Sequence, residues 1–99
     1  MKRLPLLPQE LDLVQAVFKY HSEVSSVVLF GSRAKGTHSD RSDVDLVVLG
    51  KVTPLRAEAI AAELDELPLP YRFEVQSFEH IKHQALLDHI KRVGIAIYP

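Results

Sequence analysis

A turn of small residues and a pair of aspartates are the features of this chain whose chemistry and spacing stand out. Gly31 and Ser32 end an apolar run, where backbone amides and a hydroxyl can approach an anion closely. Ten residues separate Ser32 from Asp43, which with Asp45 begins a second apolar run. Because strand side chains alternate, both carboxylates should point to one face. Paired carboxylates opposite such a turn predict a site for Mg²⁺ and a nucleoside triphosphate.

Hydrophobic periodicity predicts the elements that must position these residues. In chain order it predicts a helix over 9–20, a strand over 24–30, a short helix within 31–35, a strand over 44–49, a helix over 54–67, a strand over 71–77, a helix over 78–92 and an edge strand over 95–98. Thr53 before Pro54 favours a helix start, and Pro68 favours its end. This order predicts an α/β fold in one domain over residues 1–99, with a mixed sheet of about four strands flanked by helices.

Each predicted helix carries an apolar stripe that should face the sheet. The stripes are Leu11, Leu13, Val14, Val17 and Phe18 in the first long helix, Ile60, Ala61 and Leu64 in the second, and Ile81, Ala85, Ile90 and Val93 in the last. In the strand over 71–77, apolar residues alternate with polar ones, so Glu74 should lie on a polar strand face.

Composition excludes several classes of function. Twelve Lys and Arg against thirteen Asp and Glu give a net charge of −1, so no overall positive field attracts nucleic acid or an anionic membrane. The chain has no cysteine, which excludes disulfides, thiolate metal sites and thiol catalysis. The segment 1–8 is basic and then apolar, but it is too short and too rich in proline for a signal peptide or membrane span. We expect a soluble cytoplasmic protein with no room for a separate substrate domain.

The motif G-S-x10-D-x-D that begins at Gly31 matches the signature of the polymerase-beta-like nucleotidyltransferases. The wider strings GSRAKG and SDVDLVV resemble the minimal nucleotidyltransferase family of that superfamily, and the predicted order of elements follows its fold over nearly the whole chain. One departure is Lys35, where arginine is usual in the family. Lysine lacks the planar fork that binds phosphate or carboxylate through two donors.

The resemblance implies an activity and a set of site residues. Family members carry a third carboxylate on the strand after the next helix, where this chain has Glu74. With Asp43 and Asp45 it would hold two Mg²⁺ ions and favour deprotonation of the acceptor hydroxyl. The triphosphate of ATP would be held by Gly31, Ser32 and Arg33, and the reaction would transfer AMP to a hydroxyl.

The resemblance also implies a partner. Minimal family members are typically encoded with a small helical HEPN-type toxin, and they act as antitoxins by placing AMP on a tyrosine of that toxin. Two alternatives remain open at this point. The domain could bind nucleotide and neutralise its partner by occlusion without catalysis, or it could modify a small hydroxylated molecule, with a homo-oligomer building the acceptor pocket.

Other polar residues give weaker signals. Arg33 and Lys35 suit either phosphate contacts or structural charge pairing, and the pattern does not separate these roles. A P-loop is rejected, because Thr37 and His38 stand where lysine and a hydroxyl residue are required. His38 is predicted to be a polar loop residue. The histidines of the last predicted helix are expected on a solvated face rather than in a metal site, and they are His80, His83 and His89.

Overall fold

The computed structural model describes residues 4–99, which fold as alternating helices and strands. The first three residues of the N-terminal segment, whose basic character is noted above, lie outside the described part. No helix within residues 4–99 is long and apolar enough to cross a membrane. The elements are α1 (Pro8–Phe18), β1 (Val24–Phe30), α2 (Ser32–Lys35), β2 (Val44–Gly50), α3 (Pro54–Asp65), β3 (Phe73–Ser77), the 3₁₀ turn η1 (Phe78–His80), α4 (Gln84–Val93) and β4 (Ile95–Tyr98).

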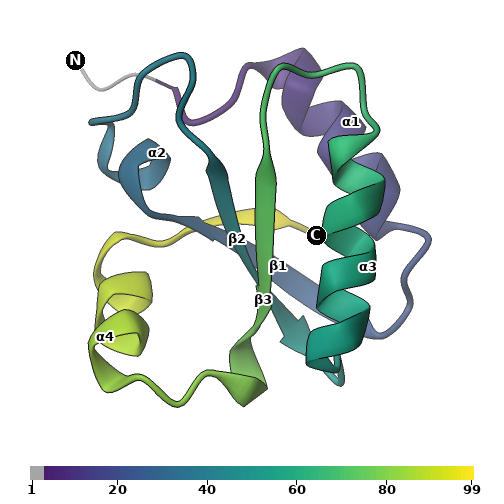
Figure 1. Cartoon of the computed structure of the whole chain (residues 1–99), viewed down its shortest axis with the longest axis vertical. Helices are drawn as coiled ribbons and strands as arrows, with labels where there is room; N and C mark the ends of the chain where they lie inside the picture. The colour runs from purple at the N-terminus through teal and green to yellow at the C-terminus, as the bar shows by residue number, and fades with distance from the viewer. Residues whose placement is uncertain (1–3) are drawn as a thin grey trace.

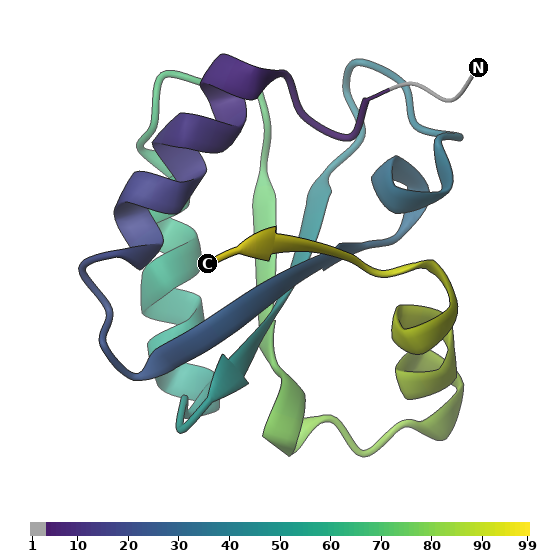
Figure 2. The same ribbon diagram turned by 180° about the vertical axis from the view of Figure 1, so that it is seen from behind.

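The four strands form one mixed sheet in the order β3-β2-β1-β4. β1 runs antiparallel to both β2 and β4, while β2 and β3 run parallel. The central strands are the two nearly continuous apolar runs of the sequence, as expected for strands covered on both faces. Helices α1 and α3 lie on one side of the sheet, and α2 and α4 lie on the other (Figures 1 and 2). The predicted fold class is therefore confirmed.

The carboxylates of the central strands face the α4 side of the sheet. Val47 packs with Ile90 of α4, whereas the adjacent Leu46 packs in the larger core with α1 and α3. Asp45 is two positions from Val47 and therefore projects toward the α4 side. Glu74 is the partner of Asp45 in the register of β2 and β3, and strand partners project to the same face.

The helix predicted over 78–92 is wrong in its first half. The chain makes the 3₁₀ turn η1, then extended backbone at Ile81, before α4 begins at Gln84. The helix restarts there because the His83 side chain accepts a hydrogen bond from the Leu86 amide. Side-chain bonds of this kind compete with helical bonds, and hydrophobic periodicity does not record them. Ala85 of α4, predicted to face inward, is consequently exposed. Leu13 of α1, also predicted in an inward stripe, is 36% exposed.

Candidate active site

The sheet brings the predicted site residues to one edge of the fold. Asp45 pairs with Phe30 of β1 on one side and with Glu74 of β3 on the other. Gly31 directly follows Phe30, so the glycine–serine turn (Gly31 and Ser32) lies next to Asp45. The alternation predicted for the strands therefore places a turn and two carboxylates side by side across three strands.

Gly31 is in close contact with Asp45, and its backbone conformation explains why glycine stands here. Its φ of 77° and ψ of −157° belong to a region that glycine adopts almost alone. A β-carbon at this position would also overlap the Oδ2 oxygen of Asp45. The motif glycine is thus required both by the turn and by the carboxylate against which the turn packs.

The three carboxylates influence one another electrostatically. Partial burial, the negative charges of Glu74 and Asp43 and a hydrogen bond with Glu74 together raise the pKa of Asp45 to about 6, and burial contributes most. A cluster of like charges with hard oxygen donors is the chemistry that Mg²⁺ prefers. Within residues 4–99, however, no three His, Cys, Asp or Glu side chains are already gathered as a metal site. The donor chemistry fits the metal, and Asp43 and Glu74 are exposed to solvent.

Arg33, predicted among the nucleotide-binding residues, has a structural role. The residue is only 3% exposed. Its Nε and Nη2 donate to the Ser42 carbonyl at 3.1 and 3.0 Å, and its Nη1 donates to the Pro5 carbonyl at 3.1 Å. The guanidinium also lies 4.2 Å from the centre of the Tyr71 ring. These bonds hold the loop directly before Asp43 and commit the guanidinium to backbone carbonyls.

The prediction that His89 lies on a solvated helix face is wrong, because its ring packs against the candidate site. The Gly31 amide donates to its Nε2 at 3.2 Å. Its ring packs edge-to-face on Phe30, with ring centres 6.1 Å apart. Gly31 and His89 are 58 positions apart, and neither periodicity nor any local motif signals such a contact.

Comparison with known families identifies the fold. Residues 12–99 match the family described as polymerase beta, nucleotidyltransferase. The chain belongs to this family. Two curated relatives from Methanocaldococcus jannaschii match shorter segments of this nucleotidyltransferase domain. The putative protein adenylyltransferase MJ0604 is 38% identical over 34 residues, and MJ1305, named in the same way, is 47% identical over 38 residues. The first match covers 34% of this chain and 34% of MJ0604, and the second covers 38% of this chain and 26% of MJ1305. The chain therefore spans about a third or less of the length of these relatives.

Solved structures support the same nucleotidyltransferase fold. A toxin–antitoxin complex with AMP-PNP superposes with a TM-score of 0.72 at 19% identity, covering 89% of this chain and 71% of that one. The complex of a tri-AMPylated Shewanella oneidensis HEPN toxin with an MNT antitoxin gives a TM-score of 0.69 at 13% identity, covering 90% of this chain and 69% of that one. At these identities the likeness establishes the fold alone.

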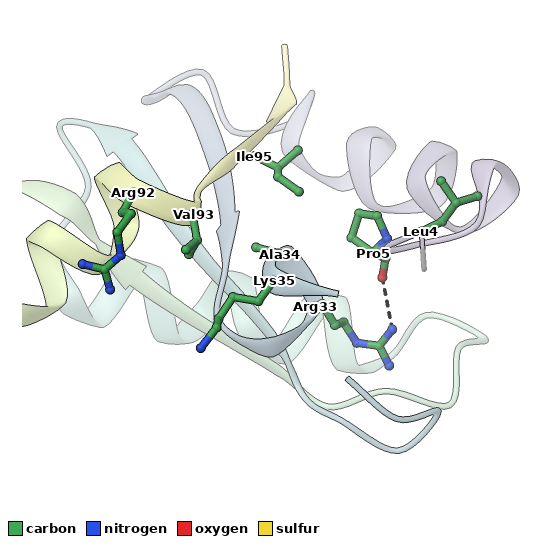
Figure 3. Close-up of a pocket in the computed structure, with 8 residues that line it drawn as sticks. All are labelled: Leu4, Pro5, Arg33, Ala34, Lys35, Arg92, Val93 and Ile95. Atoms are coloured by element: carbon green, nitrogen blue, oxygen red, sulfur yellow. Dashed lines mark hydrogen bonds between the residues drawn. The ribbon is translucent and has the colours of Figure 1, made fainter. Parts of the chain in front are cut away.

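Two cavities lie near polar residues that the sequence analysis singled out. His38 is buried at 6% exposure, and with Arg33 it lines a small cavity under the N-terminal segment. His80 is exposed, as predicted. A larger cavity of about 570 Å³ lies beside α2. Figure 3 shows Lys35 and Arg92 at one end of it, and no predicted metal ligand lines it.

Proposed function

We propose that this domain is a Mg²⁺-dependent nucleotidyltransferase that transfers AMP from ATP to a hydroxyl of a protein partner. The observation that supports this most directly is the register that sets Asp45 beside Glu74 and against Gly31. Asp43 adds a third carboxylate at the same edge, and its charge acts on Asp45. Membership in the family and the likeness to an AMP-PNP complex agree with nucleotide transfer.

The roles of the residues follow from their positions. Asp43, Asp45 and Glu74 would hold the divalent ions, which when bound stabilise the charge that develops on the entering and leaving oxygens. Ser32 offers a hydroxyl at the start of α2 for the β- and γ-phosphates. Glu74 is exposed on an edge strand, so the hydroxyl of a second macromolecule can approach its carboxylate and be deprotonated there.

The acceptor is proposed to be a tyrosine of a small HEPN-type toxin, which this domain would neutralise as an antitoxin. An AMPylated HEPN toxin in complex with an MNT antitoxin is among the similar structures. Asp43 and Glu74 are exposed, and such a site suits an acceptor carried by a protein.

Labelled ATP tests this proposal directly. The domain, incubated with Mg²⁺, labelled ATP and its co-purified helical partner, should transfer labelled AMP to the partner, as measured by mass spectrometry of the intact protein. The double variant Asp43→Asn, Asp45→Asn should transfer none. Asp12→Asn removes an exposed aspartate of α1 and should transfer as the wild type does. A partner that is neutralised without acquiring AMP, by wild type and double variant alike, would show a binding module that acts by occlusion.

Gly31→Ala should reduce transfer more than it reduces stability. Left-handed backbone costs an alanine about 1–3 kcal/mol, and the new methyl group must displace the flexible Asp45 carboxylate. A displaced ligand of this kind lowers the rate by about 10²-fold. Transfer per folded molecule and the midpoint of urea unfolding measure the two effects. Gly36→Ala is the matched control, since Gly36 has a φ of 78° but lies at the other end of α2; equal rates for both variants would contradict the role given to Gly31.

A further inference from the structure

The amide of Gly31 is already bonded within the protein. It donates to His89 Nε2 at 3.2 Å, so this ring nitrogen carries no proton and the ring proton is on Nδ1. The carbonyl of Gly31 accepts from the Lys35 amide at 3.2 Å. Both peptide groups that flank the Gly31 α-carbon are therefore held, one by α4 and one by α2.

Helix α4 is docked so that His89 stays in this place. The next residue, Ile90, is only 5% exposed and packs with Phe30 and Val47 of the central strands. The His89 ring packs edge-to-face on Phe30, the last residue of β1. Aromatic packing on one side and a hydrogen bond on the other fix the direction of the imidazole.

The contact determines the direction of the turn itself. Gly31 adopts a backbone conformation that is nearly closed to other residues, and glycine itself can adopt many others. A contact from outside the turn must therefore select this one. The acceptor at His89 selects the orientation of the peptide between Phe30 and Gly31. The next peptides are held by bonds around α2, because the Lys35 amide donates to the Gly31 carbonyl and the Thr37 amide donates to the Ser32 carbonyl at 3.0 Å. The bond to His89 and these bonds together fix where Ser32 lies relative to β1.

We propose that His89 is a positioning residue for the triphosphate, which holds the glycine–serine turn through the Gly31 amide so that Ser32 meets the phosphates in a preformed geometry. The proposal rests on the proposed function and adds to it a residue outside the G-S-x10-D-x-D motif. It also assigns the Gly31 amide to the protein rather than to the nucleotide.

Two substitutions separate the hydrogen bond from the packing. His89→Phe keeps a ring against Phe30 and removes the acceptor. His89→Gln restores an acceptor at about the position of Nε2. Losing one preorganised contact should raise the KM for ATP about five- to tenfold and change kcat little, because ground state and transition state lose the same binding. His89→Gln should recover most of the KM.

A second measurement does not depend on activity. In the metal-free and nucleotide-free protein, hydrogen exchange of the Gly31 amide should be about tenfold faster in His89→Phe than in the wild type. His89→Gln should return the exchange rate toward that of the wild type. A wild type that transfers no AMP would refute the proposed function, and the exchange rates would still decide whether His89 holds the turn.

Three outcomes would overturn the role of His89. Unchanged KM and kcat in His89→Phe, with only a lower unfolding temperature, would show a purely structural residue. A lower KM in that variant would show that His89 competes with the phosphates for the amide. Equal exchange rates of the Gly31 amide in wild type and His89→Phe would show that the bond does not hold the turn.

Discussion

Replacing Asp45 with asparagine is expected to stop nucleotidyl transfer and, at the same time, to stabilise the metal-free protein at neutral pH. Asp45 is the central member of the carboxylate site, paired with Glu74 and packed against Gly31. A metal ligand that contributes several kcal/mol to the transition state is worth about 10³-fold or more in rate. Asparagine keeps the shape of the side chain and removes the charge on which this contribution depends.

The gain in stability follows from the ionisation of Asp45. Burial, followed by the charges of Glu74 and Asp43, raises its pKa from the ordinary 3.8 to about 6. Between these two pH values the folded protein binds a proton that the unfolded chain releases, so the free energy of unfolding falls as pH rises through this window. Asp45 is partly exposed, and solvent screening reduces the cost of its charge to about 1 kcal/mol. For a domain of this size that is about 5 °C in unfolding temperature.

Thermal unfolding in EDTA at pH 4 and pH 7.5 measures this effect. Asp45→Asn should exceed the wild type at pH 7.5 and match it at pH 4, and added Mg²⁺ should stabilise only the wild type. Asp12→Asn, on the exposed face of α1, controls for the loss of one negative charge. An asparagine variant less stable than the wild type at pH 7.5 would contradict the cost assigned to the Asp45 charge.

Strands and carboxylates could be predicted from the sequence because each depends on a local pattern. β1 begins and ends where predicted, since its apolar run is bounded by polar residues before Val24 and by Gly31 after Phe30. The period of two along a strand determines that Asp45 and Val47 share a face. The resemblance to a family identified Glu74, and the register then placed it beside Asp45.

Two residues of the site region could not be predicted, for different physical reasons. His89 depends on where α4 restarts, and a capping bond at His83 shifts that start away from the one predicted. For Arg33, the family resemblance implies a place at the triphosphate, while the residue pattern alone does not separate phosphate contact from structural pairing. Its burial depends on carbonyls of two separate segments, 5 and 39–42, and no pattern of side chains records where backbone carbonyls converge.

Arg33→Met should cost about 2–4 kcal/mol of unfolding free energy, because it leaves the partly buried carbonyls of Ser42 and Pro5 without their donors. Total stability in small domains is about 5–15 kcal/mol, so the variant loses a large share of it. Arg33→Lys keeps the charge but cannot bond both carbonyls and cover the Tyr71 ring, so we expect it to recover only part of the loss.

The midpoint of urea unfolding measures the loss, and Arg41→Met is the matched control because Arg41 is an exposed cation of the same loop. Arg33→Lys with the midpoint of the wild type would show that charge, rather than the planar fork, holds the loop. The bond from Arg33 to Ser42 also lies one residue before Asp43. Loosening it should therefore weaken Mg²⁺ binding in the molecules that remain folded, and a rise in the Mg²⁺ concentration needed for half-maximal transfer would link this buried arginine to the site that it supports.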